Sequence, residues 1–190
     1  MRLAKVMADD QNPCLSRKVG VVVVDPSTHG IVGAGYNGPP ENTPHCNDVE
    51  FLRNFFWPQL TLSEKDCLHG LGFNTPEKVS QLNQCPRNIL GYSCGKRAEL
   101  CSCQHAERNA LNKLPIPAKG LIMFCWCGVP CIQCAGSIIN AGIQEVHCIK
   151  EKDYHVSSRW LFEHGSTKLI EHEAIDLKLE KNNGVKENVR

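Results

Sequence analysis

Two short motifs separated by an apolar segment constrain how this 190-residue chain can fold. The first is the His-Ala-Glu of residues 105–107, and the second is the Pro-Cys-Ile-Gln-Cys of residues 130–134. One imidazole and two thiolates are a zinc ligand set, and three protein ligands leave the fourth tetrahedral position for water. The fold must therefore bring His105, Cys131 and Cys134 together around one ion.

Each motif is expected to start a helix. Helix 106–114 stops at Pro115, helix 131–141 closes at Gly142, and the apolar residues 121–126 between them indicate a strand. The exposed N–H groups at the two helix starts favour the thiolate forms of the paired cysteines. The two cysteines stand three residues apart on one helical face, so both sulfur atoms can reach one ion.

Glu107 stands two residues after His105, where it can reach the metal site without being a ligand. A carboxylate there can take a proton from water and later return it to a departing amine. The pattern H-x-E … P-C-x-x-C is the signature of zinc deaminases. A closed structural zinc site is the alternative, but such a site has no use for the carboxylate of Glu107.

The remaining pattern is that of an α/β fold. Residues 19–24 are a β-branched run typical of a strand covered on both faces, and turn residues at 25–30 lead into a returning strand at 31–36. We expect one domain over residues 1–175, a three-layer α/β/α sandwich with a five-stranded mixed sheet. Further elements are expected at residues 3–10 (helix), 145–150 (strand), 157–164 (helix) and 167–171 (strand).

Two parts of the chain lack these signals. Residues 39–103 are rich in Cys, Pro, Gly and Asn, and they are predicted to be an irregular insert with one short helix at 49–56. Residues 176–190 are predicted to be a flexible C-terminal tail.

Charge and hydropathy exclude some functional classes. The net charge of +1 provides no basic field for nucleic acid, and no apolar run has the length of a membrane span. The first residues are too short an apolar stretch for a signal peptide, so a cytoplasmic location is expected, or the host cytoplasm for a viral protein. Twelve cysteines in a reducing compartment favour metal binding over disulfides.

The chain resembles the deoxycytidylate (dCMP) deaminases of the cytidine deaminase-like zinc enzymes over about residues 1–170. A Gly-Tyr-Asn-Gly-Pro-Pro segment distinguishes the dCMP deaminases, because other members of the cytidine deaminase-like enzymes generally lack it. The segments that carry the resemblance are residues 17–21, 35–40, 44–46, 105–110, 130–134 and 141–146.

The resemblance implies a hydrolase that converts dCMP to dUMP and ammonia in pyrimidine nucleotide biosynthesis. It implies a homohexamer, and allosteric activation by dCTP with Mg²⁺ and inhibition by dTTP. By the same resemblance, the expected substrate contacts are Asn37 with the deoxyribose and base, the Ala106 backbone N–H with the pyrimidine carbonyl, and Ser16, Lys18 and Tyr154 near the phosphate; the expected effector contacts are Gly35, Tyr36 and Gly38.

Some of these enzymes carry a second, structural zinc ion. Cys14, Cys46 and Cys103 stand at matching places, and the fourth ligand is either Cys94 or Cys101. A site of four cysteines would hold the insert together. Another partial set is Cys67, His69 and Cys85.

Other interpretations stay open from the sequence. A tRNA adenosine deaminase or a cytidine deaminase shares the zinc ligands, but these enzymes typically have Glu where Val129 precedes Pro-Cys. A guanine or riboflavin-pathway deaminase lacks support from the Gly-Tyr-Asn-Gly segment. A non-catalytic nucleotide sensor would not require Glu107. The segment Cys125-Trp126-Cys127 departs from the family pattern and leaves the tolerance for a C5 substituent on cytosine open.

Overall fold

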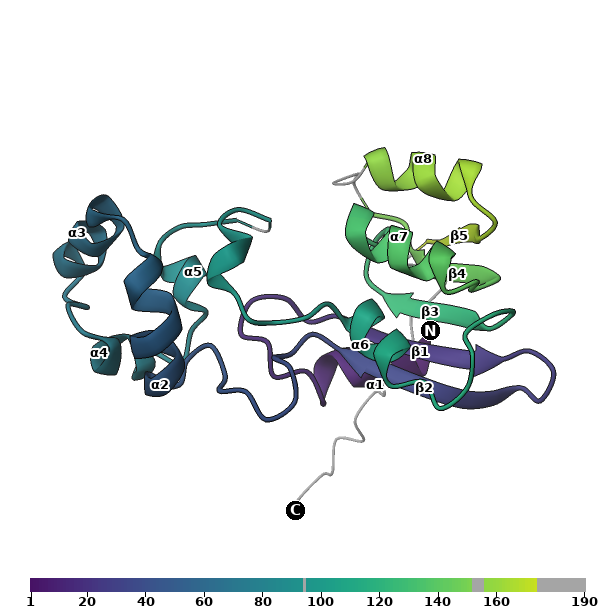
Figure 1. The fold of residues 1–190 in the computed structure, drawn as a ribbon, viewed down its shortest axis with the longest axis horizontal. Helices are drawn as coiled ribbons and strands as arrows, with labels where there is room; N and C mark the ends of the chain where they lie inside the picture. Colours follow the sequence, from purple (N-terminus) through teal and green to yellow (C-terminus); the bar gives the residue numbers. More distant parts are fainter. Residues whose placement is uncertain (94, 152–155, 174–190) are drawn as a thin grey trace, which may run out of the picture.

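A five-stranded mixed sheet forms the centre of the computed structural model, which describes residues 1–93, 95–151 and 156–173 (Figure 1). The strand order is β2-β1-β3-β4-β5; β1 is antiparallel to β2 and β3, whereas β3, β4 and β5 are parallel. The predicted mixed sheet is therefore confirmed. The strands are β1 (Gly20–Asp25), β2 (Gly30–Tyr36), β3 (Ile122–Trp126), β4 (Glu145–Ile149) and β5 (Lys168–His172).

Helices cover the sheet on both sides, as the predicted three-layer sandwich requires. On one face, a Cβ atom added at Gly20 would lie 2.2 Å from the carbonyl oxygen of Ala4, so α1 packs directly on β1. On the other face, a Cβ atom at Gly35 would lie 2.3 Å from the carbonyl oxygen of Ala106 in α6. The two glycines let both helices approach the sheet closely. The helices are α1 (Arg2–Asp9), α6 (Ala106–Asn112), α7 (Ile132–Asn140) and α8 (Val156–His164).

The main core lies between the sheet and helices α6, α7 and α8. Alternate strand residues point into it, because successive side chains of a strand face opposite sides. The regular apolar period of these elements explains why their positions follow from sequence. The fully buried residues of this core include Val21, Val23, Met123, Cys125, Ile138, Val146 and Cys148.

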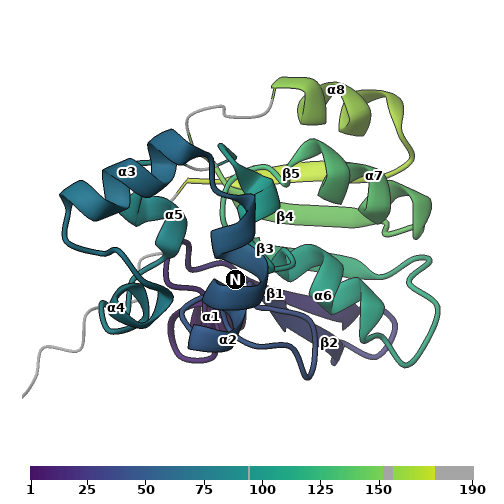
Figure 2. The same ribbon diagram turned by 60° about the vertical axis from the view of Figure 1, so that its left-hand side comes forward.

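The prediction of an irregular insert was wrong, because the segment folds into a helical lobe beside the sheet (Figures 1 and 2). Its helices are too short to show an apolar period, and two of them begin at a proline, Pro76 and Pro86. Thr61 starts the longest with a capping box. The elements are α2 (Val49–Phe51), the π-helix η1 (Leu52–Phe56), the 3₁₀ helix η2 (Trp57–Gln59), α3 (Leu62–Gly70), α4 (Pro76–Ser80), α5 (Pro86–Ile89) and the 3₁₀ helix η3 (Ala98–Leu100).

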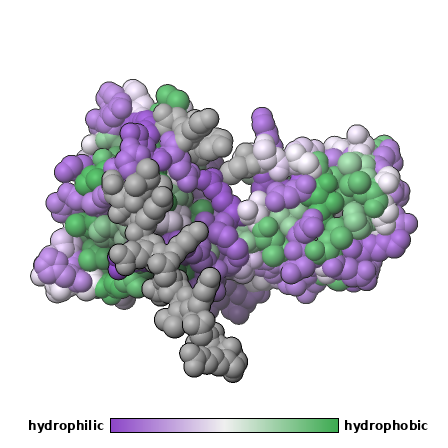
Figure 3. Space-filling view, turned by 180° about the vertical axis from the view of Figure 1, so that it is seen from behind, coloured by the Kyte–Doolittle hydropathy of each residue, from purple (hydrophilic) through white to green (hydrophobic). Residues whose placement is uncertain are grey.

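The lobe has a hydrophobic core of its own. Leu52, Phe56, Leu68 and Leu100 are completely or almost completely buried in it. Figure 3 also shows hydrophobic residues at the surface of the lobe, and Leu62 is 80% exposed. The lobe therefore gains its stability from apolar packing rather than from metal binding alone.

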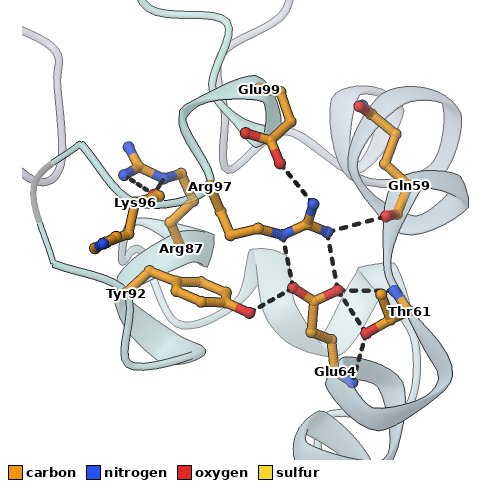
Figure 4. Close-up of polar contacts among 8 residues, drawn as sticks. All are labelled: Gln59, Thr61, Glu64, Arg87, Tyr92, Lys96, Arg97 and Glu99. Atoms are coloured by element: carbon orange, nitrogen blue, oxygen red, sulfur yellow. Dashed lines mark hydrogen bonds and ion pairs between the residues drawn. The ribbon is translucent and has the colours of Figure 1, made fainter.

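A buried carboxylate ties together the segments of the lobe (Figure 4). Glu64 of α3 is 7% exposed, and its carboxylate accepts hydrogen bonds from the Nε (2.8 Å) and Nη2 (2.9 Å) atoms of Arg97. The hydroxyl of Tyr92 (2.6 Å) and both the N–H and hydroxyl of Thr61 also donate to it. Although burial raises the pKa of Glu64, these donors bring it down to about 2.

The two ends of the lobe meet in a short bridge. The N–H of Gln104 donates to the carbonyl of Gly38 (2.8 Å), and the N–H of Gly38 donates back to Gln104 (3.3 Å). The lobe thus leaves the sheet after β2 and returns directly before His105. The predicted tail, 176–190, lies outside the described residues, and no described helix is long and apolar enough to cross a bilayer.

Candidate active site

His105, Cys131 and Cys134 converge at the starts of two helices. His105 is the N-cap of α6 and Cys131 is the N-cap of α7, so the predicted helix starts are confirmed. The Nδ1 atom of His105 lies 3.4 Å from the Sγ atom of each cysteine. All three donor atoms lie within 4.8 Å of one another.

This donor set fits a zinc ion. Zn–N and Zn–S bonds at a tetrahedral ion place nitrogen and sulfur ligands about 3.6 Å apart, close to the separations seen here. Hydrogen bonds from Cys134 and then His105 lower the pKa of Cys131 to about 3, which favours the thiolate that zinc requires. Both helix N-termini add a positive field at the site.

Glu107 lies in the first turn of α6 and is 4% exposed. Burial raises the pKa of its carboxyl, while the charges of His105 and Arg17 partly oppose that shift. A raised pKa makes this carboxylate a stronger base than that of an exposed glutamate. Its position beside the three donors suits the predicted role of proton carrier.

Asn37 joins the loop before β1 to helix α6. Its side chain is buried, its Oδ1 atom accepts the N–H of Ala106 (2.9 Å), and its Nδ2 atom donates to the carbonyl of Arg17 (3.2 Å). The Ala106 N–H that we expected to reach the substrate is thus engaged by Asn37. The two predicted substrate contacts lie next to each other in the fold.

Two of the predicted phosphate contacts, Ser16 and Lys18, lie in the loop before β1. The ammonium of Lys18 donates to the carbonyl of Asn12 (2.5 Å), and the hydroxyl of Ser16 donates to Asn88 of α5 (3.2 Å). Tyr154 lies outside the described residues. Sequence analysis missed Asn12, whose buried side chain also donates to the carbonyl of Val19 (2.9 Å) and so fixes this loop.

The predicted effector residues lie along the end of β2. Gly35 permits the close approach of α6, as described above. The carbonyl of Tyr36 accepts from the side chain of Asn109 (2.8 Å), and Gly38 forms the bridge that closes the lobe. Each of these residues therefore has a structural role, in helix packing, hydrogen bonding or closing the lobe, that the sequence did not reveal.

A second cluster of thiols lies between the lobe and the sheet. Hydrogen bonds with Cys101, Cys14 and Cys46, in that order of size, raise the pKa of Cys103. The contact with Cys103 lowers the pKa of Cys14 to about 5 and that of Cys101 to about 6. Cys94 lies outside the described residues.

The other partial set does not form a comparable group. Cys67 is exposed in α3, whereas Cys85 is buried at the start of α5 near Cys46 and Cys101. His69 is exposed in the last turn of α3. Cys85 therefore lies closer to the second thiol cluster than to the residues with which we grouped it.

Comparison with known families agrees with the donor set. Residues 1–150 match the model of the cytidine and deoxycytidylate deaminase zinc-binding region. The chain belongs to the cytidine and deoxycytidylate deaminase family. The matched residues include the three zinc-type donors and Glu107, so the family's zinc-binding region coincides with the site built from geometry.

Curated relatives within this family carry the name deoxycytidylate deaminase. The Schizosaccharomyces pombe protein is 29% identical over 161 residues, which is 83% of this chain and 38% of the relative. The Saccharomyces cerevisiae protein is 29% identical over 147 residues, which is 77% of this chain and 35% of the relative. The chain thus spans less than two fifths of the length of these relatives.

Solved structures share the deaminase fold at low sequence identity. The dCMP deaminase of cyanophage S-TIM5, solved in complex with dCMP and dUMP, has a TM-score of 0.55 at 19% identity. That match covers 90% of this chain and 92% of the cyanophage chain. A Thermotoga maritima diaminohydroxyphosphoribosylaminopyrimidine deaminase/reductase has a TM-score of 0.51 at 17% identity, covering 93% of this chain and 36% of that protein.

Proposed function

We propose that this chain hydrolyses dCMP to dUMP and ammonia. The observation that carries the proposal is the buried carboxylate of Glu107 beside one imidazole and two thiols, which is the residue set of a zinc deaminase. The names of the curated relatives support dCMP as the substrate. We further propose that residues 1–175 act as one deaminase domain in the cytoplasm.

His105, Cys131 and Cys134 would hold the catalytic zinc ion, which supplies an activated water when bound. Glu107 takes the proton from the attacking water and passes it to N3 of the cytosine ring as the C4–O bond forms. The same carboxylate then takes the remaining proton from the new hydroxyl at C4 and delivers it to the amine, so that the C4–O bond becomes a carbonyl, the C4–N bond breaks and ammonia leaves. The burial that raises its pKa makes the carboxylate a stronger base for taking these protons.

The substrate contacts follow from the loop before β1 and the start of α6. Asn37 would meet the deoxyribose and base, and the Ala106 N–H would meet the pyrimidine carbonyl once Asn37 turns toward the ligand. Ser16, Lys18 and Tyr154 complete the proposed contacts near the phosphate.

Regulation and assembly belong to the same proposal. Gly35, Tyr36 and Gly38 would contact the effectors, with dCTP and Mg²⁺ activating and dTTP inhibiting a homohexamer. Hyperbolic dCMP kinetics that neither nucleotide changes would contradict this part.

A second, structural zinc would bind Cys14, Cys46 and Cys103, with either Cys94 or Cys101 as the fourth ligand. The contact between Cys101 and Cys103 supports Cys101. Elemental analysis tests this directly, because two zinc ions per chain are expected and one would contradict the second site.

The activity is tested by measuring ammonia release from dCMP, CMP, deoxycytidine and tRNA in parallel. The proposal expects dCMP to be the best substrate, and it expects Glu107→Gln to lose activity while its zinc content stays unchanged. A cytidine deaminase would prefer deoxycytidine, and a tRNA adenosine deaminase would act on adenosine in tRNA. Full activity of Glu107→Gln would refute the role of the carboxylate.

A further inference from the structure

Two buried asparagines from distant parts of the chain meet on the same pair of carbonyl oxygens. Asn12 follows α1 and is 4% exposed, and Asn37 follows β2 and is 7% exposed. The carbonyl of Val19 accepts the Nδ2 atom of Asn12 (2.9 Å) and the backbone N–H of Asn37 (3.3 Å). The carbonyl of Arg17 accepts the Nδ2 atoms of both Asn12 (3.4 Å) and Asn37 (3.2 Å). Each carbonyl oxygen has two lone pairs, so both donors can be satisfied at once.

Asn12 organises the loop that carries these two carbonyls. The loop lies between α1 and β1 and contains no helix or strand of its own. The Oδ1 atom of Asn12 accepts the backbone N–H of Cys14 (2.8 Å), and its backbone carbonyl accepts the ammonium of Lys18 (2.5 Å). Because the loop lacks regular hydrogen bonding, these contacts of one buried residue fix the directions of its carbonyl groups.

The two carbonyls in turn decide which way the side chain of Asn37 faces. The Nδ2 atom of an amide only donates and its Oδ1 atom only accepts, so Nδ2 must face the carbonyl of Arg17. The Oδ1 atom of Asn37 is then directed at α6, where it accepts the N–H of Ala106 (2.9 Å). Ala106 directly follows His105, so a chain of hydrogen bonds runs from Asn12 to the zinc-type donors.

We propose that Asn12 is a positioning residue for the deamination, which holds Asn37 in place through the carbonyls of Arg17 and Val19. The inference rests on the proposed function, in which Asn37 meets the deoxyribose and base of the nucleotide. When the side chain of Asn37 turns toward the ligand, its backbone N–H can remain on Val19. The site is therefore largely ordered before the nucleotide arrives, which lowers the cost of binding.

The first test is steady-state kinetics of the zinc-loaded chain with dCMP. Asn12→Ala is expected to raise the KM for dCMP by about 5- to 50-fold, the effect of one or two lost hydrogen bonds. Because Glu107 and the zinc donors are untouched, kcat is expected to stay within about threefold. In an Asn37→Ala background, Asn12→Ala is expected to change the KM by less than about twofold, since the two residues act through one route.

Hydrogen exchange at the N–H of Ala106 gives a second measurement that does not depend on activity. This N–H is protected by Asn37, so it is expected to exchange faster in Asn12→Ala than in the wild type. Asn12→Asp serves as a second variant that keeps the side-chain volume and the acceptor for Cys14. When ionised it cannot donate to the two carbonyls, so the same rise in KM is expected.

Thr167 provides a matched control at a distance from this loop. It is 1% exposed, and its Oγ1 atom donates to the carbonyl of Ile143 (2.7 Å), so it makes the same kind of buried contact with the main chain. Thr167→Val is expected to lower the urea midpoint, as Asn12→Ala does, but to keep the wild-type KM and the wild-type exchange at Ala106. The zinc content of every variant must match that of the wild type.

Four outcomes overturn the inference. A wild-type KM in Asn12→Ala, or wild-type exchange at Ala106, would remove the positioning role. An equal rise in KM with and without Asn37 would show that Asn12 acts by another route. A rise in KM for Thr167→Val as large as that for Asn12→Ala would reduce the effect to general destabilisation. Wild-type protein that releases no ammonia from dCMP would refute the proposed function, and the inference would fall with it.

Discussion

The buried carboxylate of the lobe offers the sharpest stability prediction, the substitution Glu64→Gln. It keeps the side-chain volume but removes the charge that Arg97 and Tyr92 contact. The pKa of Glu64 falls from 4.5 to about 2 on folding, and at about 1.4 kcal/mol per pKa unit this corresponds to about 3.5 kcal/mol. Breaking a buried ion pair costs about 3–5 kcal/mol, so two routes give a similar magnitude.

The pH dependence of this stabilisation has a definite sign. Because the folded pKa of Glu64 is depressed, the stabilisation is present above about pH 4.5 and is lost as the pH falls toward about 2. Wild type and Glu64→Gln should therefore differ most near pH 7 and converge in acid.

Urea unfolding at pH 7 and pH 3 measures both effects. The midpoint of Glu64→Gln should lie about 1–3 M below that of the wild type at pH 7, and the gap should shrink at pH 3. The control Glu77→Gln removes an exposed carboxylate from a surface pair and should leave the midpoint unchanged. Equal shifts for the two variants, or a gap that does not depend on pH, would refute the reasoning.

Further substitutions test the site and its supports. Glu107→Gln should lower kcat by about 10²- to 10⁴-fold at constant zinc content, as measured by ammonia release and elemental analysis. Cys134→Ser should remove one zinc ion per chain together with the activity, and retention of that ion would contradict its role as a ligand. Cys101→Ser should remove the second ion while the exposed Cys67→Ser keeps both, and equal metal contents would contradict the Cys101 assignment. Gly35→Ala should destabilise the chain by about 1–3 kcal/mol in thermal unfolding, because its Cβ atom would meet the backbone of α6; an unchanged midpoint would contradict the close packing.

The sheet and its flanking helices could be predicted because each has a strong local signal. Residues 19–24 form a β-branched run, and the strand observed there is Gly20–Asp25. The two site motifs mark their own helix starts: His105 and Cys131 were expected in the first turns of these helices, and they lie at the N-caps. Spacing within a motif limits which side chains can meet, and this explains the successful placement of the three donors.

The lobe could not be predicted because its stability comes from contacts between short segments. No helix of four or five residues, such as α5 or α4, shows an apolar period, and the partners of Glu64 lie far along the chain. Asn12 was missed for a similar reason. It belongs to no motif, and only the folded loop before β1 brings its side chain to the carbonyls of Arg17 and Val19.

The bridge between Gly38 and Gln104 joins the lobe to the sheet at one place, so the stability of the lobe and that of the sheet can be considered separately. Because both ends of the lobe meet at this bridge, substitutions, insertions or deletions within the lobe are expected to leave the strand register and the spacing of the catalytic groups unchanged. A foreign segment joined at Gly38 and Gln104 in place of the lobe is therefore expected to leave the sheet and its strand register intact.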